Sequence, residues 1–284
     1  MNIGIFGIGA IGSIIIKYLR KDLDYKYYYL NRSTRDVILI EYKGRITKIN
    51  LKLSNHIVVQ LDWLIVCLKE YHYQDATEKL KSIISPTTKI AIFQNGINLS
   101  KHISNFSNPN NILETIIDCP CQLIEKQSYL QLRQPNVILP AHPLSELFRS
   151  LFTEEINVTI LQDFVASQWE KLIESSSLGA MQVLHMTPCS LFKHEKNIEE
   201  YLLLIEEGVK VAHSHGVQLD HDLKDKLRKK LLTYPATKSS SMLLDKLAGK
   251  QLELEAKIGA IVKLADKNKV EIPTTLRIYH SILL

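Results

Sequence analysis

Apolar and polar positions follow two different patterns along the chain, and the pattern changes near residue 163. Before it, continuous apolar runs predict strands that are buried on both faces. These runs are Ile3–Phe6, Tyr27–Leu30, Asp62–Leu68 and Lys89–Phe93. After it, apolar residues recur at helical spacing, without strand-like alternation. The pattern predicts an α/β protein, with a Rossmann-type doubly wound sheet in a domain at 1–162 and an all-helical C-terminal domain at 163–284.

The pattern is weaker in other places. Short strands are expected at Asn111–Ile117 and Tyr129–Leu132, and Arg45–Leu53 suits an edge hairpin, but the strand order between 105 and 162 is not defined. Leu252–Lys267 is expected to be the last long helix. Glu253 would then lie just inside its N-terminus, where the helix dipole favours a carboxylate.

The first predicted strand ends in glycines spaced as G-x-G-x-x-G, and a predicted helix follows. At such a turn the first glycine permits a tight bend, the second lets a pyrophosphate approach, and the third lets the helix lie close to the strand. The N–H groups of the helix then point at the phosphates. A dinucleotide site is favoured over an ordinary glycine-rich turn, and it would comprise Gly7, Ile8, Gly9, Ala10, Ile11 and Gly12.

The end of the second predicted strand favours NADP over NAD. An NAD enzyme needs an acid there for the ribose hydroxyl, but the residues are Asn31, Arg32 and Ser33. Arg32, with its two neighbours, would bind a 2′-phosphate. The alternative is a solvated turn arginine.

Two more polar residues follow predicted strands. Lys69 comes after the third strand, and Asn95 after the fourth, in a turn with Gly96. Ligands gather at the carboxyl ends of strands in open α/β sheets. Lys69 is therefore a candidate neighbour of phosphate or nicotinamide, or else a surface lysine.

A stripe on the first helix after the boundary carries Lys171, Ser175 and Gly179, which are spaced by four. The stripe could line a cleft. The alternative is an exposed lysine on a helix that glycine weakens, and the spacing alone favours this alternative.

Composition narrows the class of protein. The 284 residues are 45% hydrophobic and 23% charged, which is typical of a soluble globular protein. A formal net charge of +5, spread over helices, does not indicate nucleic-acid binding. No stretch is suited to span a membrane or to act as a signal peptide, so a cytoplasmic location is expected. The four cysteines form no metal or disulfide framework.

The chain resembles the ketopantoate reductase (2-dehydropantoate 2-reductase) family over almost its whole length. The motifs that carry this resemblance are Gly7–Gly12, Arg32, Lys69, Asn95-Gly96, Trp169-Glu170-Lys171-Leu172, the segment Ser240–Asp245, and Glu253 with Gly259. The resemblance implies an NADPH-binding Rossmann domain, a helical domain and an active site in the cleft between them. It also implies a place in pantothenate biosynthesis.

The resemblance further implies the roles of single residues. Lys171 would be the general acid that protonates the ketone oxygen as hydride arrives from the nicotinamide. Glu253 would hold this lysine and a substrate hydroxyl, and Asn95 would position nicotinamide and substrate. Ser241 would help to hold the substrate carboxylate. Asn95 and Glu253 are thus expected at both the cofactor and the substrate.

The chain also departs from the family pattern. Ser175 and Gly179 stand where substrate-binding asparagines are usual, His72 replaces a glutamine, and 138–143 replaces a glycine-rich stretch. These changes suggest a divergent member whose 2-oxo acid has extra bulk over Gly179.

We therefore expect NADPH-dependent reduction of a small 2-oxo acid, either 2-dehydropantoate or a branched relative. One alternative is a non-catalytic NADPH-binding protein that senses redox state, and another is a different NADP-linked hydroxy acid dehydrogenase. The sequence leaves the oligomeric state open, with a homodimer as one option.

Overall fold

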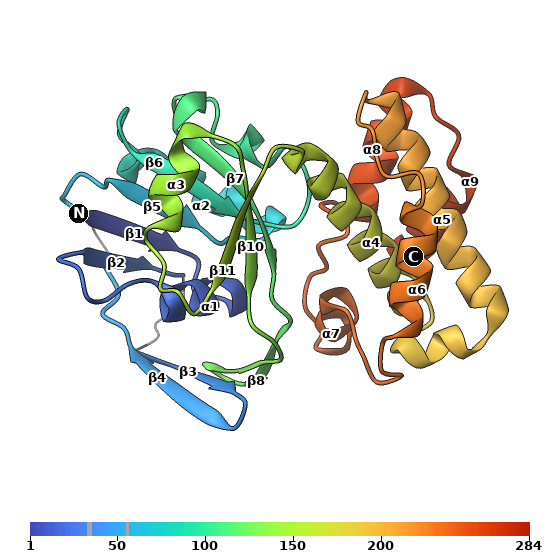
Figure 1. The fold of residues 1–284 in the computed structure, drawn as a ribbon, viewed down its shortest axis with the longest axis horizontal. Helices are drawn as coiled ribbons and strands as arrows, with labels where there is room; N and C mark the ends of the chain where they lie inside the picture. Colours follow the sequence, from blue (N-terminus) through green and yellow to red (C-terminus); the bar gives the residue numbers. More distant parts are fainter. Residues whose placement is uncertain (33–35, 55–56) are drawn as a thin grey trace. The chain divides into compact units, whose positions relative to one another are not determined.

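The structure, a computed structural model, describes residues 1–32, 36–54 and 57–284. The chain forms two compact units (Figure 1). The first comprises Met1–Gln94 and Asn98–Phe164, and the second comprises Asn95–Ile97 and Val165–Leu284. The turn that carries Asn95 thus belongs to the second unit, although it follows a strand of the first.

A seven-stranded sheet in the order β11-β10-β7-β6-β5-β1-β2 forms the centre of the first unit, within the described residues. Its strands are β1 (Asn2–Phe6), β2 (Lys26–Leu30), β5 (Trp63–Val66), β6 (Lys89–Phe93), β7 (Ile112–Asp118), β10 (Asn136–Pro140) and β11 (Asn157–Leu161). The five neighbouring strands β7, β6, β5, β1 and β2 are parallel, while β10 is antiparallel to β7. The carboxyl ends of these five strands share one edge of the sheet, as a Rossmann-type site requires.

A smaller sheet has the order β4-β3-β9-β8. Its strands are β3 (Val37–Tyr42), β4 (Arg45–Asn50), β8 (Cys121–Glu125) and β9 (Ser128–Gln131). The pair β3–β4 is an antiparallel hairpin, but it spans 37–50, so only β4 lies within the range 45–53 where the sequence predicted one. The sequence did not predict that this hairpin would join β9 in a separate sheet.

Helices pack against the large sheet through apolar side chains. They are α1 (Ala10–Tyr18), α2 (Tyr73–Ile83) and α3 (Pro143–Arg149). The first unit also contains the short 3-10 helices η1 (Glu70–His72), η2 (Leu99–His102) and η3 (Pro109–Asn111). In α1, Ile14, Ile15 and Ile16 are all fully buried. This burial fixes α1 against the sheet and so places its N-terminus at the carboxyl end of β1.

The second unit is helical, so the predicted fold, a Rossmann-type sheet followed by helices, is confirmed. Its elements are α4 (Phe164–Leu184), η4 (Cys189–Lys193), α5 (Glu195–Ser214), α6 (Leu223–Leu232), α7 (Ser241–Leu247), α8 (Ile258–Asn268) and α9 (Pro273–Leu283). Their apolar faces form one core, in which Ile173 and Ile205 are fully buried. A Cβ on Gly208 would lie 2.9 Å from Ile173 Cγ1, so glycine allows α4 and α5 to approach closely.

The prediction for the last long helix is wrong. The helix begins at Ile258 rather than Leu252, and α9 follows it. The backbone before it forms turns, in which Lys257 N donates to Leu254 O at 3.2 Å and Gly259 N donates to the same oxygen at 2.9 Å. Glu253 therefore precedes the helix, and the helix dipole does not explain its position.

Candidate functional site

The glycine-rich turn after β1 has the geometry of a dinucleotide-binding turn. Gly7 has a φ of +95°, and a Cβ there would lie 2.6 Å from the carbonyl oxygen of Cys67. A Cβ on Gly12 would lie 2.0 Å from the carbonyl oxygen of Gly7. Only glycine fits at either position, so the first and third glycines set the bend and the close approach of α1 to β1.

Gly9 differs from these two glycines because the space beside it is open. It is exposed, and among the described atoms none lies within 4 Å of a Cβ built on it. Gly9 is also the N-cap of α1, a helix whose described residues include no side-chain cap and no acid in the first turn. The backbone N–H groups of Ala10 and Ile11 thus begin a helix that suits a phosphate group.

Asn31 and Arg32 directly follow β2, and Asn31 contacts this turn. Ile8 N donates to Asn31 Oδ1 at 3.2 Å, which ties the turn to the second strand. The Arg32 side chain is 80% exposed, and its Nη1 lies 4.0 Å from Oδ2 of Asp75 in α2. A phosphate at Arg32 would therefore also meet a negative charge that the sequence did not reveal. Ser33, expected beside Arg32, lies outside the described residues.

Glu70 is the centre of a polar cluster beyond β5 and β6. It directly follows Lys69, which is the N-cap of η1. The Glu70 carboxylate accepts from Gln94 Nε2 at 2.5 Å, and it lies 2.7 Å from Lys101 Nζ and 3.0 Å from His102 Nε2. Burial alone would raise the pKa of Glu70, but His102 and Lys101 outweigh it and hold this pKa at about 2.

Asn95 and Glu253 meet in the second unit. Asn95 Nδ2 donates to Glu253 Oε2 at 3.3 Å. Glu253 is only 5% exposed, and an acid this buried normally needs such a donor. The hydrogen bond holds the carboxylate in place without help from a helix N-terminus.

Lys171 lies half-buried on α4, one turn from a carboxylate that the sequence did not single out. This acid, Glu174, accepts from Tyr234 Oη at 2.8 Å and lies 2.7 Å from Lys230 Nζ. Burial would raise its pKa, but Lys230, Lys171 and the tyrosine together lower it. Lys171 therefore lies in the field of an ionised acid on its own helix.

Ser175 and Gly179 continue the Lys171 stripe, but they offer less to a substrate than their positions suggest. Ser175 Oγ donates to the Leu172 carbonyl at 3.4 Å. A Cβ on Gly179 would lie 2.9 Å from Sδ of Met242, which belongs to α7. The expectation that a bulkier acid fills free space over Gly179 is wrong, because Met242 already lies there.

Ser241 begins α7, and side chains from two other segments hold this region. Ser240 N donates to Gln182 Oε1 at 2.6 Å, and Gln182 Nε2 donates to Lys238 O at 2.9 Å, so α4 anchors the chain before α7. Lys257 Nζ donates to Ser241 Oγ at 3.2 Å. The sequence did not single out Lys257, because its contact with Ser241 depends on how distant segments pack.

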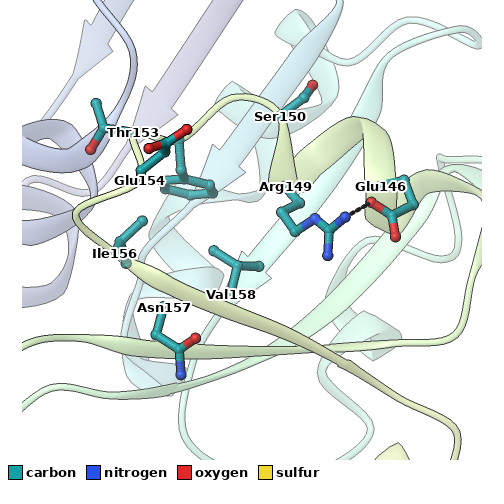
Figure 2. A pocket seen from close by; sticks show the side chains of 9 residues that line it. Glu146, Arg149, Ser150, Thr153, Glu154, Ile156, Asn157 and Val158 are labelled. Atoms are coloured by element: carbon teal, nitrogen blue, oxygen red, sulfur yellow. Dashed lines mark ion pairs between the residues drawn. The ribbon is translucent and has the colours of Figure 1, made fainter.

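A hollow with a volume of about 420 Å³ lies in the first unit (Figure 2). An ion pair joins Arg149 to Glu146 at its wall, with 2.5 Å between Nη2 and Oε2. The other lining residues are Ser150, Phe152, Thr153, Glu154, Ile156, Asn157 and Val158. None of the residues predicted from the sequence lines this hollow, so it does not belong to the predicted site.

In 1–32, 36–54 and 57–284, no helix combines the length and the apolar character needed to cross a bilayer. The same ranges contain no group of three or more His, Cys, Asp or Glu side chains arranged to hold a metal ion.

Comparisons with known proteins show the family of this chain. Residues 3–143 match the family described as "Ketopantoate reductase PanE/ApbA", and residues 163–283 match its C-terminal domain. A 2-dehydropantoate 2-reductase of Caulobacter vibrioides is 25% identical over 278 residues, which cover 96% of this chain and 94% of the relative.

Solved structures show the same fold. A dimeric ketopantoate reductase from Staphylococcus aureus is similar at a TM-score of 0.89 and 20% identity, covering 100% of this chain and 98% of that one. A D-mandelate dehydrogenase solved with NADH and anilino(oxo)acetate is similar at a TM-score of 0.87 and 17% identity, covering 100% and 97%. Because the two domain matches together extend over nearly all of the sequence, the chain belongs to the ketopantoate reductase family of oxidoreductases.

Proposed function

We propose that the protein reduces a small 2-oxo acid to the 2-hydroxy acid with NADPH, and that 2-dehydropantoate is the substrate, as in pantothenate biosynthesis. The observation that carries this proposal is the hydrogen bond between Asn95 and Glu253. It joins residues 158 positions apart, and the resemblance assigns both to the reacting centre. Nucleotide binding alone would not require this pairing.

The first unit supports the choice of cofactor. The turn at Gly7, Gly9 and Gly12 fits a pyrophosphate, since the outer positions admit only glycine and the middle one is open. Arg32 supplies a guanidinium that can bind a 2′-phosphate in a charge-assisted contact. These features favour NADPH, although the similar D-mandelate dehydrogenase was solved with NADH.

The second unit supports the chemistry. NADPH, when bound, supplies the hydride that the keto carbon receives. Lys171 gives its proton to the ketone oxygen, and its positive charge stabilises the alkoxide as it develops. Glu253, which accepts a hydrogen bond from Asn95, would accept from a substrate hydroxyl or from the lysine, as the resemblance implies. The product is a 2-hydroxy acid, and the lysine is reprotonated from solvent.

One alternative activity has a specific observation behind it. The similarity to D-mandelate dehydrogenase makes a larger 2-hydroxy acid a second candidate for the product. Met242 over Gly179 argues against an acid with extra bulk at that point. Because one similar reductase is described as dimeric, we also propose a homodimer, which light scattering coupled to size-exclusion chromatography can test.

A panel of 2-oxo acids tests the proposed function. The acids should include 2-dehydropantoate, phenylglyoxylate and 2-oxoisovalerate, each with NADPH and with NADH, and oxidation of the cofactor is followed by its absorbance. We expect the highest kcat/KM for 2-dehydropantoate with NADPH. A preference for phenylglyoxylate would favour the mandelate-type activity, and cofactor binding without turnover of any acid would favour a non-catalytic redox-sensing protein.

A further inference from the structure

Lys257 is a buried cation in contact with an exposed hydroxyl. The residue is 3% exposed, whereas Ser241 is exposed, and Lys257 Nζ donates to Ser241 Oγ at 3.2 Å. Burying an ammonium group is costly unless it is paired or hydrogen-bonded, and the bond to Ser241 Oγ is one such contact. The contact directs the buried charge toward the surface at Ser241.

The hydrogen bond also sets what Ser241 can do. A hydroxyl has one donor and two acceptor lone pairs, and an ammonium group can only donate. Because Ser241 Oγ accepts from Lys257, its own O–H remains able to donate to an anion. The serine O–H, polarised by the ammonium group of Lys257, can thus donate to an anion that arrives from solvent.

We propose that Lys257 and Ser241 together bind the carboxylate of the 2-oxo acid, with Lys257 as the residue that makes the pocket specific for an acid. The inference rests on the proposed function and names the group that recognises the substrate charge. Lys257 lies four residues after Glu253, so one short segment supplies both the acid hydrogen-bonded to Asn95 and the cation at Ser241. A carboxylate and an adjacent ketone need two such separate contacts.

The neighbouring residues support separate contacts for the carboxylate and for the ketone of the substrate. Ser175 Oγ donates to a helix carbonyl, and Met242 covers Gly179, so α4 contributes little hydrogen bonding for the substrate at these two positions. Lys171 is the proposed proton donor to the ketone oxygen. A second cation can then bind the carboxylate, and Lys257, which donates to Ser241 Oγ, supplies one.

The test compares an acid with its neutral ester. Lys257→Met keeps much of the side-chain length but removes the charge, and Lys257→Arg restores the charge. Lys263→Met is the matched control, because Lys263 is an exposed lysine of α8 that pairs with Glu255. Each variant is assayed with NADPH and either 2-dehydropantoate or its methyl ester, and its melting temperature is recorded.

We expect Lys257→Met to raise the KM for the acid by about 10- to 150-fold, the range for losing a hydrogen bond to a charged group. The KM for the ester and for NADPH should change by no more than about twofold, and Lys257→Arg should recover part of the loss. Lys263→Met should leave both substrates unchanged. An equal loss on acid and ester would show that Lys257 only supports the fold, and it would overturn the inference.

Measuring substrate binding directly tests the carboxylate site independently of the proposed catalytic activity. Calorimetric titration with 2-dehydropantoate is done on the unmodified protein and on Lys257→Gln, which also serves if the methionine variant does not fold. Binding weakened by about tenfold or more supports the carboxylate site even without turnover. Equal binding by both proteins overturns it, whereas failure of the unmodified protein to reduce any 2-oxo acid counts against the proposed function.

Discussion

Arg32 and Asp75 face each other at the expected end of the cofactor, with 4.0 Å between Nη1 and Oδ2. Their side chains are 80% and 73% exposed, so the pair contributes little to stability. Its importance is electrostatic, because a phosphate attracted by Arg32 is also repelled by Asp75. Each residue of the pair therefore leads to a prediction about cofactor choice.

Arg32→Ala should remove most of the preference for NADPH. A charge-assisted contact with a phosphate contributes roughly 1.5 to 3 kcal/mol, or about 10- to 150-fold in affinity. Calorimetric titration with NADPH and NADH measures this preference. Equal affinities for the two cofactors in the unmodified protein would contradict the role of Arg32.

Asp75→Asn should have the opposite effect and tighten NADPH binding. Because the pair is exposed and screened by salt, we expect a gain of only about two- to fivefold at low ionic strength, and a smaller gain as salt is added. NADH affinity should not change. Glu78→Gln is the matched control, since Glu78 lies on the same helix and pairs with Lys81; a similar gain in this control would point to overall charge instead.

Lys171→Ala should reduce kcat by about 10²- to 10⁴-fold while NADPH binding stays nearly the same, because a positioned acid is lost. Arginine should not restore activity, since a guanidinium does not release its proton near neutral pH. Lys230→Ala is the control, because Lys230 contacts the same Glu174. If Lys171→Ala kept more than half of the turnover, another group would have to be the acid.

Gly179→Asn should not improve the use of 2-dehydropantoate, because its Cβ would lie 2.9 Å from Met242 Sδ. The methionine would have to move, so we expect a lower melting temperature. Ser175 is only half-buried, and Ser175→Asn should lower the KM for 2-dehydropantoate by about two- to twelvefold, the gain from one hydrogen bond. Steady-state kinetics of the two single variants measure both effects. A lower KM in Gly179→Asn would show that the Met242 side chain can move aside at little cost.

Glu70 should make the stability of the folded protein depend on pH in the acid range. Its pKa is about 2 in the folded protein, below the ordinary value of 4.5. A lowered pKa stabilises the fold above pH 4.5, and this contribution is lost as the pH falls from 4.5 toward 2. Glu70→Gln should therefore lower the melting temperature at pH 7 but have less effect at pH 3. A decrease of equal size at both pH values would show that packing, and not charge, is responsible.

The elements that the sequence predicted best are those with a strong local signal. The glycines at 7, 9 and 12 and the apolar strands needed no tertiary information, because their spacing and their continuous apolar character are already diagnostic. The small sheet was not predictable, since the pairing of β3 with β9 joins segments far apart in the chain. Glu253 was placed in a helix because apolar residues around it have helical spacing, but the backbone turns before Ile258.

The candidate site was predictable only as a set of residues. No local pattern could show that Met242 would cover Gly179, or that Lys257 would reach Ser241, because these contacts depend on how α4, α7 and α8 pack. Asp75 beside Arg32 is a similar case, since each residue alone has the appearance of an ordinary surface charge.

Asn95–Ile97 belongs to the second unit, so a single cut in the chain cannot separate the two units. The chain passes from one unit to the other at Gln94, returns after Ile97 and passes again after Phe164. A fragment that begins at residue 165 would lack the amide that donates to Glu253, and it would leave part of the helical core without the side chain of Ile97. Cutting the polypeptide at a single peptide bond therefore yields no piece with a complete second unit, and a functional helical half would have to be supplied with the 95–97 turn as a separate peptide or by re-joining the chain in a new order.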